Sequence, residues 1–67
     1  MDTAEKGQRY ARAFRNAGTF LGKGNIARAV EALKEGRALA EELGDHQMAR
    51  RFTAEIDSAT TGGSADK

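Results

Sequence analysis

Hydrophobic residues recur at intervals of three and four along three segments of the chain, which is the spacing of one face of a helix. The first segment predicts a helix over about residues 4–21, the second over about 26–43 and the third over about 47–59. The connections between them are short, so consecutive helices should lie as antiparallel neighbours. The pattern therefore predicts an all-α fold, a three-helix antiparallel bundle.

The first predicted helix carries an apolar stripe and a separate row of arginines. The stripe consists of Tyr10, Phe14, Ala17 and Leu21, widened by Ala13 and Phe20. The arginines recur every three residues and are Arg9, Arg12 and Arg15. Asp2 or Thr3 can cap the helix, but Gly7 weakens the first turn. We therefore expect ordered helix only from near Gln8.

Both breaks between helices combine a glycine with a capping residue. In the first, Gly22 or Gly24 can adopt the left-handed conformation that ends a helix, and Asn25 can cap the next one. In the second, Gly44 ends the helix and Asp45 caps the third.

Small residues lie on the apolar face of the second predicted helix. That face consists of Ile26, Ala29, Val30, Leu33, Gly36, Ala40 and Leu43. A glycine inside a helix costs about 1 kcal/mol relative to alanine, so Gly36 indicates close packing. Ala29 and Gly36 are seven residues apart on one side. We expect them to let the backbone of the first helix approach.

Residues 13–45 resemble one tetratricopeptide repeat, a helix–turn–helix unit of about 34 residues. The similarity rests on the turn glycine Gly24, the small residues Ala29 and Gly36, the large residue Leu33 and the aromatic Phe20. Residues 39–45 look like the repeat junction common in bacterial members of the family. The first-helix tryptophan of the family is replaced by Ala13, its leucine by Asn16 and its closing proline by Glu41. The resemblance implies a helical hairpin closed by the third helix, and a different three-helix bundle is the alternative.

Length and composition limit the kind of protein. With 67 residues the chain holds one domain, which we expect over residues 1–60 with a disordered tail over 61–67. There is no cysteine, no apolar run that spans a membrane and no signal peptide. These features predict a cytoplasmic protein. Met1 and the polar tail favour a complete small protein over the end of a longer repeat array.

Charge is unevenly distributed along the chain. Residues 1–30 contain six basic and two acidic residues, a net charge of +4. Residues 31–67 contain five basic and eight acidic residues, a net charge of −3. The basic half includes the arginine row of the first helix, which is most simply interpreted as a solvated helix face, with an acidic protein partner or nucleic acid as the alternatives.

The sequence contains little that points to catalysis or to a bound cofactor. His46 is the single histidine, and without cysteine it makes no zinc site. The segment Gly22-Lys23-Gly24 lacks the spacing of a phosphate-binding loop. We therefore expect no enzyme activity, no cofactor, no metal and no small-molecule substrate.

The best-supported function is protein binding through the first helix, to another protein or to a second copy in a dimer. The candidate partner-binding residues are Arg9, Tyr10, Arg12, Phe14, Arg15 and Leu21. The less favoured alternative is nucleic-acid binding through the arginine row.

The family resemblance implies an inner surface on the first helix. Some tetratricopeptide proteins bind a C-terminal carboxylate with basic and amide side chains at that surface. Here it would be formed by Ala11, Phe14, Gly18 and Leu21, so we expect an apolar groove that receives a helix or an apolar peptide. Core packing of Phe14 and Leu21 under the third helix is the alternative.

Overall fold

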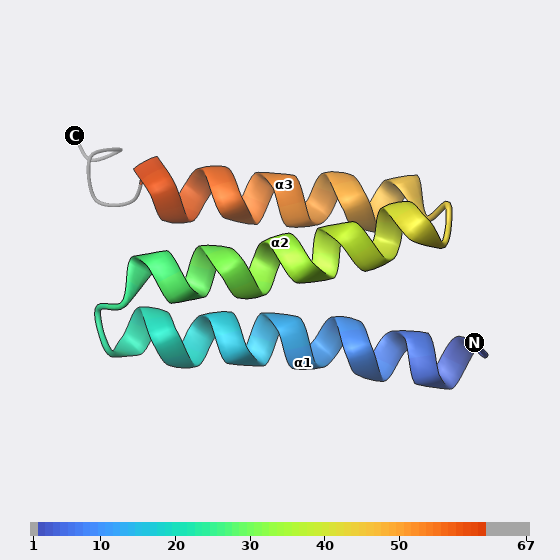
Figure 1. Ribbon diagram of the computed structural model, residues 1–67, viewed down its shortest axis with the longest axis horizontal. Helices are drawn as coiled ribbons and strands as arrows, with labels where there is room; N and C mark the ends of the chain where they lie inside the picture. The colour runs from blue at the N-terminus through green and yellow to red at the C-terminus, as the bar shows by residue number, and fades with distance from the viewer. Residues whose placement is uncertain (1, 62–67) are drawn as a thin grey trace.

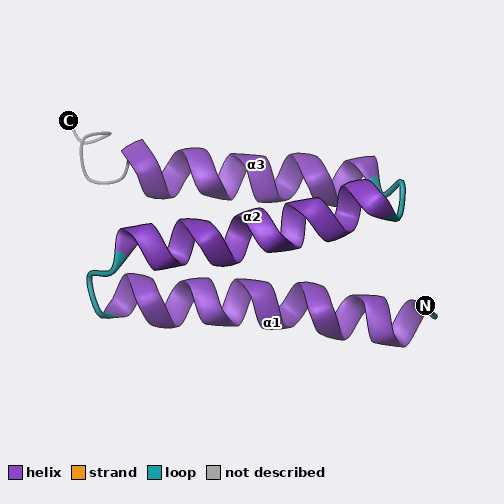
Figure 2. Cartoon of the chain, viewed as in Figure 1, coloured by secondary structure: helices purple, strands orange, loops and turns teal. Residues whose placement is uncertain are grey.

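The computed structural model describes residues 2–61, which form three helices (Figure 1). They are α1 (Thr3–Gly22), α2 (Ile26–Glu42) and α3 (His46–Thr61). Figure 2 shows them as antiparallel neighbours joined by two short loops, with α2 between α1 and α3. The predicted all-α three-helix architecture is confirmed, and every helix end lies within two residues of its predicted position.

Capping side chains set the start of each helix. The carboxylate of Asp2 accepts the Glu5 N–H at 2.8 Å, and the amide oxygen of Asn25 accepts the Arg28 N–H at 3.1 Å. The expectation that α1 begins near Gln8 is wrong, because the helix runs from Thr3 through Gly7. A good N-cap stabilises a helix by about 1 kcal/mol, which is enough to offset one internal glycine.

The two turns have the same hydrogen-bond pattern. Gly24 and Gly44 take positive φ angles of 76° and 73°, whereas Gly22 stays helical. The N–H after each turn glycine reaches back five residues. Asn25 donates to the carbonyl of Phe20 at 2.8 Å, and Asp45 donates to that of Ala40 at 2.8 Å. Both turns are therefore Schellman-type helix ends, which fold the next helix back along the previous one.

Phe52 of α3 is the centre of the core and is fully buried. Its ring stacks on Phe14 of α1 at 4.5 Å between centroids and lies 5.8 Å from the ring of Tyr10. A Cβ added at Gly36 of α2 would overlap the Phe52 ring. Gly36 thus makes room for an aromatic ring from the third helix, and the close approach of the α1 backbone there stays a prediction.

Alanines and leucines of α2 complete the core, but the ends of its predicted apolar face lie outside it. Ala29, Leu33 and Ala40 are buried. Ile26 and Leu43 remain 43% and 40% exposed because they lie at the two extremes of the helix.

The third helix is longer than the sequence pattern predicts. Thr60 and Thr61 continue α3, and their hydroxyls donate to the carbonyls of Ile56 at 3.0 Å and Asp57 at 2.7 Å. Thr61 therefore belongs to α3 and not to the predicted tail, and residues 62–67 of that tail lie outside the described residues.

Candidate protein-docking groove

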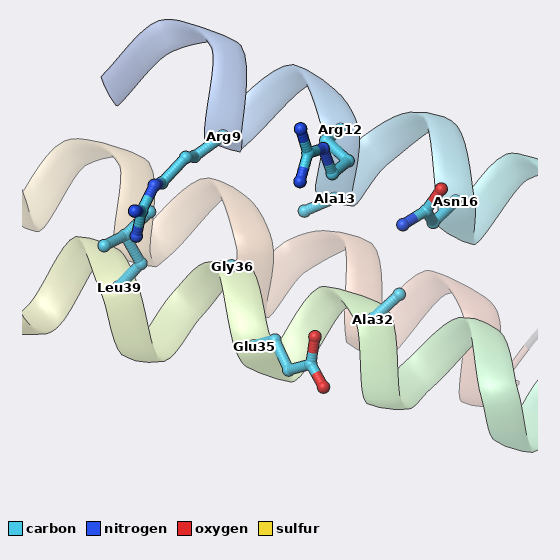
Figure 3. Close-up of a pocket in the computed structure, with 8 residues that line it drawn as sticks. All are labelled: Arg9, Arg12, Ala13, Asn16, Ala32, Glu35, Gly36 and Leu39. Atoms are coloured by element: carbon cyan, nitrogen blue, oxygen red, sulfur yellow. The ribbon is translucent and has the colours of Figure 1, made fainter. Parts of the chain in front are cut away.

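A groove of about 280 Å³ runs between α1 and α2. It lies on the face of the pair that looks away from α3, which passes behind both helices in Figure 3. We call it the α1–α2 groove. Its lining residues are Arg9, Arg12, Ala13, Asn16, Ala32, Glu35, Gly36 and Leu39.

Small and apolar residues form the floor of the groove. Gly36 is buried, and Ala13, Ala32 and Leu39 are partly buried. Three of these four residues are glycine or alanine, so a partner helix could approach the pair closely. Leu39 supplies the largest apolar side chain of the floor.

Long polar side chains form the α1 rim. Arg9 extends toward α2 at the level of Leu39 (Figure 3) and makes an ion pair with Glu5 at 3.7 Å. Arg12 and Asn16 stand further along the same rim, and both are exposed. Within residues 2–61, Arg12 has no ion-pair partner. Its guanidinium is therefore the uncompensated positive charge of this rim.

The α2 rim is acidic where it faces Arg12. Glu35 is exposed and stands across the groove from Arg12 (Figure 3), and it too has no ion pair among residues 2–61. Glu31 and Glu42 lie four and seven residues from Glu35 and share its side of the helix, as does Arg28. The charged residues that line the groove are therefore Arg9 and Arg12 on α1 and Glu35 on α2.

The predicted arginine row is split by the geometry of the helix. Arg9 and Arg12 line the groove, but Arg15 does not. Each step of three residues falls about 60° short of a full turn, so a row spaced by three winds around the helix. Arg15 is consequently rotated about 60° from Arg12 and about 120° from Arg9, and only Arg9 and Arg12 line the groove.

The predicted apolar residues of the first helix lie apart from the groove. Phe14 is stacked under α3 on Phe52, and the Arg51 guanidinium lies 5.3 Å from its ring centroid. Of the two alternatives for Phe14, core packing under the third helix is thus confirmed. Tyr10 is buried in the same cluster, whereas Leu21 is 41% exposed and is not packed in the core.

Asp45 connects α1 to the second turn. Its carboxylate caps α3 by accepting the Met48 N–H at 3.2 Å, and it accepts the Tyr10 hydroxyl at 3.2 Å. The ammonium of Lys6 lies 3.8 Å away. Burial raises the pKa of Tyr10, and the hydrogen bond to Asp45 and the negative charge of that carboxylate raise it further. The sequence predicted the cap, but not the contacts with α1.

Sequence reasoning missed five of the groove residues: Ala13, Asn16, Ala32, Glu35 and Leu39. In an antiparallel hairpin, facing residues of the two helices have numbers with a constant sum. Here the sum is about 48, and Asn16 of α1 and Ala32 of α2 are one such pair. Combined with helical periodicity, that rule could have located the groove.

Between residues 2 and 61, no group of three or more acidic or histidine side chains is arranged to hold a metal ion. In the same range, no helix has the length and apolar character needed to cross a membrane. Comparisons with protein-family models, curated proteins and solved structures gave no match for the chain.

Proposed function

We propose that this chain is a small, non-catalytic protein-interaction module of the cytoplasm. It binds a helix of a protein partner in the α1–α2 groove. The groove carries the proposal because it combines an apolar floor with charged rims. Amphipathic helices are recognised by such grooves through apolar anchors and flanking polar contacts.

The exposed groove side of the α1–α2 pair supports this function. α2 packs on α1 and on α3, whereas no described residue covers the groove side of the α1–α2 pair. A chain of this size buries only about 60% of its unfolded surface, so its own core is thin. A partner helix in the groove would bury Leu39 and the apolar stems of the two arginines.

Three features support a tetratricopeptide-like form for the module. Gly24 takes the left-handed turn conformation, and Ala29 and Leu33 are buried in the hairpin. α3 packs on α2 as the first helix of a following repeat would. Repeat units of this kind bury their free faces against neighbours, which fits a role in binding other proteins.

Site-specific photo-crosslinking in cells tests the proposed function. A photoreactive amino acid at Asn16, on the groove rim, should give adducts of discrete mass. The same amino acid at Ala27, which is exposed outside the groove, should not. Arg12→Glu should reduce the Asn16 adduct at least tenfold, and Arg15→Glu should leave it unchanged. Equal adducts from both positions would mean that the groove is not the binding surface.

A mobility-shift titration with duplex DNA at two salt concentrations separates protein binding from the nucleic-acid alternative. Phosphate contacts by the arginines would give a shift that weakens steeply with salt and requires both Arg12 and Arg15. We expect no such shift, because Arg9 is paired with Glu5 and Arg15 lies outside the groove.

A further inference from the structure

We propose that the partner in the α1–α2 groove is a second copy of the chain. The α1–α2 faces of the two copies pack against each other, and a two-fold axis parallel to the groove relates the copies. The inference rests on the proposed function and names its partner.

The charges at the centre of the groove are self-complementary in one orientation. Arg12 and Glu35 stand on opposite rims at the same level (Figure 3), and neither has an ion pair among residues 2–61. A two-fold axis along the groove exchanges the rims but keeps the level. It therefore places Arg12 of each copy over Glu35 of the other, and two equivalent ion pairs form.

The other face-to-face arrangement is disfavoured by the same charges. A two-fold axis across the groove would place the α1 rim of one copy on the α1 rim of the other. With that axis at the level of these two residues, Arg12 would approach Arg12, and Glu35 would approach Glu35. Like charges at an interface oppose association, so the charge pattern selects the axis along the groove.

The face has enough area for a reversible dimer. Helices of this length are about 30 Å long and about 10 Å across, so the α1–α2 face covers about 600 Å² on each copy. The pair would bury about 1,200 Å², the lower limit for specific interfaces. The small floor residues Ala13, Ala32 and Gly36 let the copies approach closely. We expect a dissociation constant on the order of 10–100 μM.

Charge exchange tested by analytical ultracentrifugation provides the experiment. Arg12→Glu and Glu35→Arg should each raise the dissociation constant at least tenfold. In a dimer of either variant, residue 12 of each copy would face a residue 35 of the same charge, so both ion pairs would become repulsive. An equimolar mixture of the two variants should dimerise as the wild type does. In that mixed pair, one contact is native and the other is its exchanged form. Circular dichroism checks that every variant is folded.

Matched charge changes outside the groove serve as controls. Arg15→Glu and Glu41→Arg alter charge by the same amount on exposed positions that do not line the groove, so both should dimerise normally.

Two results would overturn the dimer. Neither would contradict docking of another protein in the groove, which photo-crosslinking from Asn16 tests separately. A wild-type chain that stays monomeric up to about 1 mM excludes the second copy at the expected affinity. Crosslinks from Asn16 to a different protein would then still support docking in the groove. If neither charge reversal changes the dissociation constant, a wild-type dimer must use another face. The mixture of the two variants would then dimerise no more tightly than either variant alone.

Discussion

At the scale of single residues, the contact between Gly36 and Phe52 determines how three helices share one core. The Phe52 ring crosses α2 where a side chain is missing and reaches Phe14 of α1. Because the ring is fully buried, a methyl group at position 36 would force it to shift within a packed core. The glycine therefore has a packing role that outweighs its poor helix propensity.

Gly36→Ala should destabilise the fold by up to about 2 kcal/mol, because an overpacking cost of about 1–3 kcal/mol is offset in part by a gain of about 1 kcal/mol in helix propensity. Gly18→Ala is the matched control, since nothing lies within 4 Å of its added Cβ. That change should stabilise by up to about 1 kcal/mol. Urea denaturation measures both, and a stabilised Gly36→Ala variant would show that the ring does not need the gap.

Tyr10 is the single tyrosine of the chain, so its titration can be followed by tyrosinate absorbance. Its pKa should lie above the ordinary value of about 10 in the folded protein, because burial and Asp45 both disfavour the phenolate. Asp45→Asn keeps the cap but removes the charge, so it should lower this pKa partway toward the ordinary value. Asp57→Asn, at an exposed position, should leave the pKa unchanged.

The same shift predicts how stability depends on pH. The folded state holds the Tyr10 proton more tightly than the unfolded state does. Its contribution to stability is therefore complete below about pH 10 and is lost as the pH rises through the raised pKa of the folded protein. Thermal denaturation of wild type and Tyr10→Phe across that range would reveal it, and parallel pH curves for the two would argue against it.

At the scale of helices and turns, the two turns have the same backbone conformation but differ in their tertiary contacts. Asn25 and Asp45 each cap the helix that follows a left-handed glycine. Only the Asp45 carboxylate also accepts a hydrogen bond from α1, through Tyr10. The second turn is therefore anchored by tertiary contacts that the first turn lacks.

Asn25→Ala should cost about 1 kcal/mol through the lost cap. Asp45→Ala should cost about 2 kcal/mol or more, because it also leaves the buried Tyr10 hydroxyl without a partner. Chemical denaturation of both variants, together with Asp45→Ala/Tyr10→Phe, measures the difference. Equal losses for the two single variants would mean that the contact with Tyr10 contributes nothing.

The helices and turns could be predicted because their causes are local in the sequence. The apolar spacing, Gly24, Gly44 and their capping neighbours act over a few residues, and all take the predicted roles. The groove depends instead on how α1 is rotated against α2. Because of that rotation, Arg12 and Glu35 stand on opposite rims of the groove, and Arg15 does not line it. In the sequence alone, the row of arginines looks continuous.

At the scale of the whole molecule, dimerisation in the groove would link stability to protein concentration. Because dimerisation stabilises only the folded chain, the thermal midpoint should rise between about 10 μM and about 1 mM protein. In the Arg12→Glu variant, whose dissociation constant is at least tenfold higher, the rise over that range should be clearly smaller. Added salt should reduce the rise by screening the Arg12–Glu35 pairs. A midpoint independent of concentration in the wild type would contradict the dimer.

The order of the helices has a further consequence for the rate of folding. Within the described residues, close backbone approach joins only neighbours along the chain, α1 with α2 and α2 with α3, and α3 reaches α1 through side chains such as Phe52. Such low contact order is typical of domains that fold in microseconds to milliseconds. The chain also contains no proline, so no slow isomerisation phase should follow. Refolding after a temperature jump, followed by Tyr10 fluorescence, should therefore be a single fast exponential.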